Sequence, residues 1–391
     1  MKVQDKSSTD AKATNSDLEK QEQDPPCPPC AETAQARLSA FSALGFINRF
    51  LALWIFLAML VGILLGNFVD DVEPALQKGK FVNVSVPIAI GLLVMMYPIL
   101  CKVQYEKLHV VFKSREIWVQ MGFSIIINWI VAPLVMAWAD CSQLGLAWAF
   151  LPDKQGLREG LILVGIARCI AMVLIWNNLA GGNGDYCAIL VAINSLLQIV
   201  LFAPISLLFI RVFNPHSHSA IDISYSTVAT SVGVFLGIPL GAAILTRLVL
   251  LRLLGPDRYK SYFLRFAAPW SLIGLLFTIL VLFASQGKQV VDQIVSVVRV
   301  AAPLIVYFAL IFFLTLLVAR RMGFRYGYAV TQSFTAASNN FELAIAVAVA
   351  AYGPQSDQAL AATVGPLIEV PVLLGLVYGV KWFAKRRNWK E

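Results

Sequence analysis

The sequence predicts an all-α polytopic membrane protein, and three observations support this fold class. Of the 391 residues, 58% are hydrophobic and only 14% are charged, and the mean hydropathy is +0.72. Apolar windows of about 20 residues, the length of a helix that spans a bilayer, recur along most of the chain. Lys and Arg gather in alternate connections between these windows, as they do in cytosolic loops.

Residues 1–45 have a different composition from the rest of the chain. They are rich in Lys, Asp, Glu, Ser, Gln and Pro and have no apolar period, so we expect a disordered cytosolic tail. The tail lacks the apolar core of a signal peptide, and the first span is therefore expected to act as the insertion signal. Cys27 and Cys30 form a CxxC between prolines. Because no second Cys or His pair lies nearby, an incidental or regulatory role is favoured over a structural zinc site.

Ten apolar windows follow the tail. The fourth and fifth are separated only by the segment 181–185, but together they greatly exceed a bilayer thickness and count as two spans. The predicted spans are 46–69, 81–101, 116–139, 158–183, 186–213, 223–250, 261–285, 297–319, 325–352 and 359–383.

The charge distribution predicts how these spans are oriented. If both termini are cytosolic, 23 of the 31 Lys and Arg residues lie on the cytosolic side, and Arg168 lies within the membrane. The basic residues are dispersed at helix ends rather than gathered on one soluble face, so the net charge of +8 does not indicate nucleic-acid binding. The lipid bilayer is the expected partner. We expect the plasma membrane, with the vacuolar membrane as the alternative.

Ten spans divide into two halves of five, residues 46–214 and 215–391. Because each half has an odd number of spans, the second half must be inverted relative to the first, as in the repeats of secondary transporters. Asn177–Asn178 in the fourth span and Asn339–Asn340 in the ninth occupy corresponding places. These amide pairs, together with Gly181–Gly182 and with Ser338, predict two broken helices that meet at the midplane beside a cavity, where freed backbone groups find partners or water.

The polar residues of these spans are candidates for a transport site. A charged side chain at the bilayer centre costs roughly 2.5–3.5 kcal/mol, so such residues usually face a cavity, pair with one another or carry function. The candidates for substrate binding are Cys169, Arg168, Asn177, Asn178, Asn339 and Asn340, and those for proton coupling are Glu342 and Glu369.

Each candidate also has a structural interpretation. Arg168 could be a counter-ion to Glu342 or Glu369 instead of a transport residue, and the amides could satisfy broken backbone. Cys169 could be a small core residue, as free Cys often is. The other intramembrane or loop cysteines, Cys101, Cys141 and Cys187, are spread over different segments and do not form a disulfide framework.

Four segments carry a resemblance to a known family. Residues 167–173, 176–178, 338–346 and 365–371 resemble the arsenite efflux permeases of the bile acid/arsenite/riboflavin transporter superfamily, and the resemblance covers roughly residues 46–390. It implies export of arsenite, with antimonite as a further candidate, and it implies that Cys169 and Glu342 are the positions used for transport. The tail with Cys27 and Cys30 is not part of the family pattern.

The chemistry of arsenite fits these residues. Near neutral pH it is mostly an uncharged trihydroxide with a soft centre, which thiolate sulfur prefers to bind. One thiol aided by hydroxyl-binding amides allows reversible capture, whereas three thiols would hold the cargo too tightly. A carboxyl group in a low-dielectric site can exchange a proton near neutral pH, so Glu342 is expected to couple transport to protons, alone or with Glu369.

Other functions remain as alternatives. A channel would share the polar midplane but needs no titratable carboxyl group, and a sodium-coupled bile acid or organic anion carrier would need no thiol. An enzyme is not expected, because His109, His216 and His218 all lie in loops and no Walker-type phosphate-binding run occurs. The sequence therefore predicts no cofactor and no metal site. It leaves the oligomeric state open, a homo-oligomer included.

Overall fold

The computed structural model describes residues 50–69, 71–76, 78–107, 115–137, 147, 150–170, 172–212, 224–285, 287, 294–387 and 389. The predicted tail with Cys27 and Cys30 lies outside the described residues, as do Cys141 and the three histidines.

The first half of the described chain is helical apart from one short hairpin, which the all-helical pattern did not predict. In this hairpin Lys80 pairs with Ser85, and Val82 and Asn83 form its turn at positive φ. The elements are α4 (Leu51–Phe68), α5 (Val72–Leu76), β1 (Lys80–Phe81), β2 (Val84–Ser85), α6 (Val86–Cys101), η1 (Tyr105–Lys107), α8 (Arg115–Ile126), η2 (Ile127–Val131), α9 (Ala132–Ala137), α11 (Gln155–Ile166), α12 (Met172–Ala180) and α13 (Gly184–Val212).

The second half contains only helical elements among its described residues. The chain bends at Gly255, within the helix Ile238–Arg258, where φ is 77°. Glycine adopts this conformation without steric cost because it has no Cβ. The elements are α14 (Tyr225–Val232), η3 (Gly233–Gly237), α15 (Ile238–Arg258), η4 (Tyr259–Leu264), α16 (Arg265–Ser285), α18 (Ile294–Arg321), α19 (Tyr326–Ala337), α20 (Phe341–Tyr352) and α21 (Asp357–Arg386).

The prediction of an all-α membrane protein is confirmed at this level. Within the described residues, five helical stretches are long and apolar enough to cross a membrane by length and composition. They are Ile117–Met136, Gly184–Arg211, Tyr225–Ser285, Val295–Arg321 and Asp357–Arg386, and shorter apolar helices cover Leu53–Phe68, Val86–Cys101 and Phe341–Tyr352. Ten spans in two inverted halves therefore remain a prediction.

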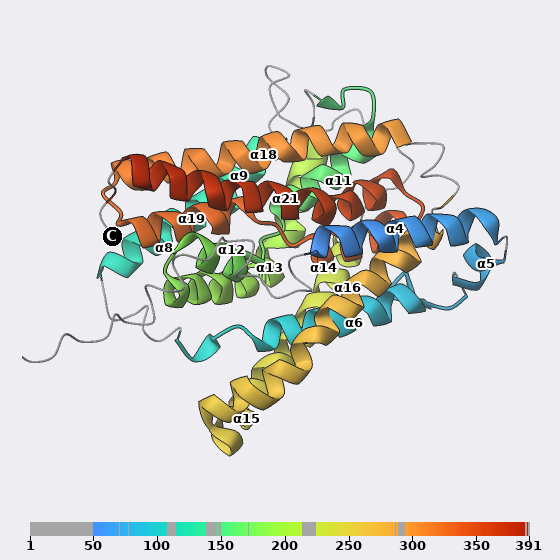
Figure 1. Cartoon of the computed structure of the whole chain (residues 1–391). Coiled ribbons are helices and arrows are strands. Elements are labelled where there is room, and N and C mark those ends of the chain that lie inside the picture. The colour runs from blue at the N-terminus through green and yellow to red at the C-terminus, as the bar shows by residue number, and fades with distance from the viewer. Residues whose placement is uncertain are drawn as a thin grey trace, which may run out of the picture. The chain divides into compact units, whose positions relative to one another are not determined.

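The helices pack in two groups, and both groups line the cavity described below. In one group α16 packs against α4 and α6, and α6 also contacts α15 (Figure 1). In the other, α21 contacts α11, α18 and α20. Gly62 of α4 permits a close approach to α16, since a Cβ atom at this position would lie 2.6 Å from the carbonyl oxygen of Leu280. Small residues of this kind allow helices in membranes to pack backbone against backbone.

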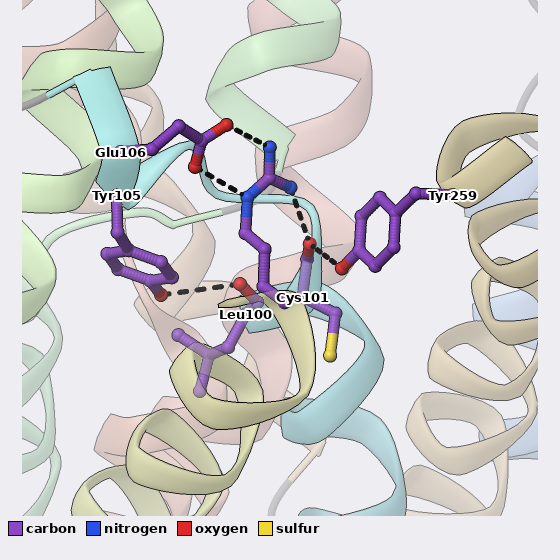
Figure 2. A network of polar contacts seen from close by, with 6 residues as sticks. Leu100, Cys101, Tyr105, Glu106 and Tyr259 are labelled. Atoms are coloured by element: carbon purple, nitrogen blue, oxygen red, sulfur yellow. Dashed lines mark hydrogen bonds and ion pairs between the residues drawn. The ribbon is translucent and has the colours of Figure 1, made fainter. Parts of the chain in front are cut away.

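A polar network ties the end of α6 to α15 and η4 (Figure 2). The guanidinium of Arg247 donates two hydrogen bonds to the carboxylate of Glu106, at 2.8 and 2.6 Å, and a third to the carbonyl oxygen of Cys101 at 3.0 Å. The hydroxyl of Tyr259 donates to the same carbonyl at 2.8 Å, and its ring lies under the Arg247 guanidinium. Arg247 thus satisfies a carbonyl at the C-terminus of α6 that has no partner within the helix.

Disrupting this network should destabilise the end of α6. We expect Arg247→Ala to lower the free energy of unfolding by about 1–3 kcal/mol, because Glu106 loses its charged donor and the Cys101 carbonyl keeps only the Tyr259 hydroxyl. Glu106 keeps 38% of its side chain exposed, so solvent screening limits the coupling between the two charges to about 1 kcal/mol. A double-mutant cycle of Arg247→Ala and Glu106→Gln, read by thermal unfolding in detergent, measures this coupling. Strictly additive effects would contradict it.

Candidate functional site

Two helices are interrupted where the sequence places its polar residues. The first helix stops at Ile166, where α11 ends, and resumes at Met172 as α12. The second stops at Ala337, where α19 ends, and resumes at Phe341 as α20. Each piece has 12 residues or fewer, which is shorter than the roughly 20 residues needed to span a bilayer.

The two interruptions pair with each other in an antiparallel bridge between Arg168 and Asn339. The amide of Cys169 donates to the carbonyl of Ser338 at 3.2 Å, and the amide of Asn340 donates to the carbonyl of Ala167 at 3.1 Å. Backbone groups freed by the breaks therefore bond across the crossing point. This pairing satisfies buried polar backbone groups and fixes the two breaks against each other.

The position of the first break corrects the sequence prediction. The amides Asn177 and Asn178 were expected to interrupt the fourth span, but both lie within α12, and the break lies at Arg168–Cys169 instead. The physical reason is that the Asn177 carboxamide accepts a hydrogen bond from the hydroxyl of Thr331 at 2.8 Å, which joins α12 to α19 without breaking the helix. Asn178 is exposed.

Arg168 is fully buried and is held by neutral groups. Its guanidinium donates to the carbonyl oxygens of Gly165, Ile166 and Ala336 and to the hydroxyl of Tyr307. The three carbonyls belong to the last turns of α11 and α19, which carry partial negative charge and lack partners within their helices. The structural role considered from the sequence, a counter-ion to Glu342 or Glu369, does not describe these contacts. Arg168 instead caps two helix C-termini.

Glu369 of α21 contacts the second break through two hydrogen bonds. Its carboxylate accepts a hydrogen bond from the hydroxyl of Ser338 at 2.6 Å and from the backbone amide of Asn339 at 3.4 Å. The Asn339 side chain donates in turn to the carbonyl of Val164 at 2.6 Å. Glu369 is 3% exposed and is thus a hydrogen-bonded part of the crossing.

Asn340 and Gln198 complete the polar shell around the breaks. The Asn340 side chain caps α20 by accepting from the amide of Leu343 at 3.1 Å. Gln198 of α13 accepts from the backbone amide of Arg168 at 3.0 Å, while its own side-chain nitrogen is buried with no partner among the described residues. Gln198 was noticed in the sequence as a polar residue of the fifth span, but its contact with the break depends on the tertiary fold.

A cavity of about 650 Å³ lies beside the crossing and is lined by both helix groups. Its polar lining includes Cys169, Asn339, Asn340, Glu342 and Glu369, five of the eight candidates from the sequence. The other three candidates, Arg168, Asn177 and Asn178, are not among the described residues that line it.

The thiol of Cys169 and the carboxyl group of Glu342 are the reactive groups that this cavity brings together. The Cys169 side chain is 4% exposed, and its sulfur accepts a hydrogen bond from the amide of Val173 at 3.4 Å. Glu342 lies half-buried in the first turn of α20, where the helix N-terminus favours a negative charge. Among the described residues, no other residue hydrogen-bonds to its carboxylate, so Glu342 can change its protonation without breaking the crossing.

Two basic residues at the cavity were missed as site residues. Lys102, just after α6, and Arg265, at the start of α16, both line it. In the sequence they appeared as topology anchors at the ends of apolar segments. Burial lowers the pKa of the Lys102 ammonium. Lys102 follows the second predicted span and Arg265 lies at the start of the seventh, so both are predicted on the cytosolic side. This shared side was the one sequence signal that could have placed them near the same site.

A thiol and two carboxyl groups at a cavity between two interrupted apolar helices are typical of a membrane transport protein. Comparison with known proteins agrees. Residues 89–293 match the family described as "Sodium Bile acid symporter family". The chain is 43% identical to the arsenical-resistance protein Acr3 of Corynebacterium glutamicum, over 88% of this chain and 91% of that protein.

Two further relatives cover similar shares. An uncharacterized transporter of Synechocystis is 33% identical, over 89% of this chain and 93% of that protein. The arsenical-resistance protein Acr3 of Alkaliphilus metalliredigens is 29% identical, over 88% of this chain and 94% of that protein. The chain belongs to the arsenite efflux permease family of the bile acid/arsenite/riboflavin transporter superfamily. It is an integral membrane protein and an arsenical-resistance transporter, as the sequence predicted.

Proposed function

We propose that this transporter exports arsenite, and antimonite by the same chemistry, from the cytosol in exchange for protons. The observation that supports the proposal most directly is the position of Cys169. Its thiol lines the cavity at the crossing of the two breaks, next to the amides of Asn339 and Asn340. A soft thiol beside hydroxyl-binding amides is the donor set that a soft, hydroxylated centre requires.

Capture is a ligand exchange without oxidation or reduction. The Cys169 sulfur bonds to arsenic, one arsenic–hydroxide bond breaks, and the thiol proton leaves with the hydroxide as water. Two hydroxyl groups remain on arsenic and can hydrogen-bond to Asn339 and Asn340. A single arsenic–sulfur bond is reversible when water returns, which suits a carrier that must release its cargo.

Glu342 is the group proposed to carry the coupling proton. It faces the same cavity as Cys169, and unlike Glu369 it is not engaged in holding the second break. In the proposed cycle arsenite docks at Cys169 while Glu342 loses its proton to the cytosol. The carrier then rocks, and a proton entering from outside displaces the cargo. Glu369 could share the proton, but its exchange would also loosen the crossing.

The proposal includes the arrangement in the membrane. Ten spans, in two inverted halves at 46–214 and 215–391, would place both termini in the cytosol and Lys102 and Arg265 at the cytosolic face. The cavity that these two residues line would then open inward. The plasma membrane is the proposed location, because export from the cell requires it.

Two other functions compete with this proposal. A sodium-coupled carrier of organic anions gains support from Lys102 and Arg265, which could attract an anion into the cavity. It would not need Cys169. A facilitator would move arsenite without a gradient and would not need a titratable Glu342. Uphill transport separates the facilitator from the carriers, and dependence on Cys169 separates arsenite from organic anions.

Glu342→Gln is expected to abolish the response to a proton gradient. Everted vesicles that carry the chain would accumulate arsenite against its concentration when a proton gradient is imposed. The variant would fill only to equal concentrations, because the amide binds no exchangeable proton in this range. Loss in Glu369→Gln but not in Glu342→Gln would move the coupling role to Glu369. Accumulation that persists in both variants would exclude proton exchange through these groups.

Asp153→Asn is the matched control for a carboxyl group outside the cavity. A hydrogen bond from Arg299 lowers the pKa of Asp153 to about 2. Since the folded pKa lies below the ordinary value of 3.8, any contribution of this pair is complete above about pH 4 and disappears as the pH falls through 2. The proton dependence of transport between pH 5 and 8, roughly the physiological range, should therefore be the same in Asp153→Asn and in the unsubstituted chain.

A further inference from the structure

The cavity beside Cys169 is much larger than arsenite. If each of the four heavy atoms of the trihydroxide is given the volume of a water molecule, about 30 Å³, the cargo occupies roughly 120 Å³. The cavity has a volume of about 650 Å³. Space for a considerably larger ligand therefore adjoins the thiol.

Most residues that line this space are apolar, whereas the polar lining comes from the two breaks, α20 and α21, together with Lys102, Arg265 and Ser271. Side chains of α6, α12 and α16 form much of the apolar wall, namely Met95, Met96, Met172, Ile175, Leu272 and Leu275. Arsenite presents only hydroxyl groups and gains nothing from such a surface. Apolar walls with a few convergent polar groups are typical of sites for organic ligands.

We propose that the cavity accepts trivalent arsenicals that carry one carbon substituent, RAs(OH)₂, and binds those with an aromatic substituent more tightly than arsenite. This inference rests on the proposed function, since it assigns the same thiol the same chemistry. The substituent lies against the methionines and leucines, and its burial removes apolar surface from water. Methionine side chains adapt to different shapes and make favourable contacts with aromatic rings.

Capture of such a compound is the same ligand exchange as capture of arsenite. The Cys169 sulfur bonds to arsenic, one arsenic–hydroxide bond breaks, and the thiol proton leaves in water. The product retains one hydroxyl group, which the amides Asn339 and Asn340 can bind, and the arsenic–carbon bond is untouched. The organic substituent thus replaces one of the two hydroxyl groups that captured arsenite presents to these amides, and the burial of its apolar surface outweighs the loss of that hydrogen bond.

The test is competition against labelled arsenite in everted vesicles. Phenylarsenous acid crosses bilayers by itself, so its ability to inhibit arsenite uptake is measured instead of its own uptake, and dilution checks that inhibition reverses. We expect half-inhibition at a concentration at least about tenfold lower than that of unlabelled arsenite, which corresponds to about 1.4 kcal/mol. If arsenite is transported but the phenyl compound inhibits no better than arsenite, this inference is wrong and the proposed function stands. If arsenite is not transported at all, both are wrong.

Leu272 provides the matched variants, because it lines the apolar wall and makes no contact assigned to arsenite. Leu272→Trp should fill the space and weaken inhibition by the phenyl compound about tenfold, while arsenite uptake stays within about twofold. Leu272→Met conserves volume and should change neither. Equal loss for both compounds in Leu272→Trp, or no change for either, would contradict the placement of the substituent against this wall.

Discussion

Replacing Cys169 by Ser is expected to lower arsenite transport by at least about 100-fold. Even outer partners of a metal ligand are worth about 10- to 100-fold in affinity, and Cys169 is proposed as the direct ligand. A hydroxyl group has nearly the shape of the thiol, so the packing around α12 should be preserved. It is, however, a hard donor that does not favour a soft arsenic centre over water. Uptake into everted vesicles, with the amount of folded protein measured in parallel, tests this expectation.

Cys101→Ser is the matched control for this substitution. Cys101 is also a buried free cysteine, but it is not among the described residues that line the cavity. Its backbone carbonyl takes part in the network with Arg247. Its replacement should leave arsenite transport within about twofold, as expected for a change away from the site. Equal losses in the two variants would indicate a general effect of removing buried thiols. Full activity of Cys169→Ser would exclude thiol capture.

Arg168→Ala is expected to have the largest effect on stability. The substitution leaves the carbonyls of Gly165, Ile166 and Ala336 without their donor in a region that water does not reach. A buried polar group without a partner costs about 1–3 kcal/mol, so we expect the free energy of unfolding to fall by roughly 3–5 kcal/mol in total. Thermal unfolding of the purified chain in detergent would show this loss directly.

The same variants separate a structural role of Arg168 from a direct role in transport. Arg168→Lys keeps the charge but presents it as a single point on a flexible stem, and it cannot span three carbonyls and the Tyr307 hydroxyl as a planar fork does. We therefore expect an intermediate loss of stability, with transport per folded molecule largely retained. If Arg168→Ala unfolds at the normal temperature yet fails to transport, the interpretation of Arg168 as a helix cap is wrong.

The fold class could be read from the sequence because the bilayer imposes length and polarity on every segment. Apolar runs of about 20 residues and basic loops identify a helical membrane protein without knowledge of any tertiary contact. The same logic singled out Cys169 and Glu342, since polar groups are costly in apolar segments and are kept for a reason. Both residues line the cavity.

The position of the first break could not be read from the sequence. Asn177–Asn178 looks more disruptive to a helix than Arg168–Cys169, because amides compete for backbone hydrogen bonds. In the folded chain, the hydroxyl of Thr331 on another helix donates to the Asn177 carboxamide oxygen, while the backbone of residues 167–169 bonds to the opposite break. A partner remote in sequence therefore overrode the local preference, since Thr331 lies 154 residues after Asn177 in the chain.

The sequence by itself thus determined the fold class and the chemical types present in the membrane, because hydropathy and charge act residue by residue. Only the tertiary structure decided which of these groups share a cavity. It assigned Arg168 to the ends of α11 and α19, Glu369 to the second break, and Lys102 to the cavity wall. The physical reason is that buried hydrogen bonds depend on distance and direction between segments remote in sequence, and no local pattern encodes these.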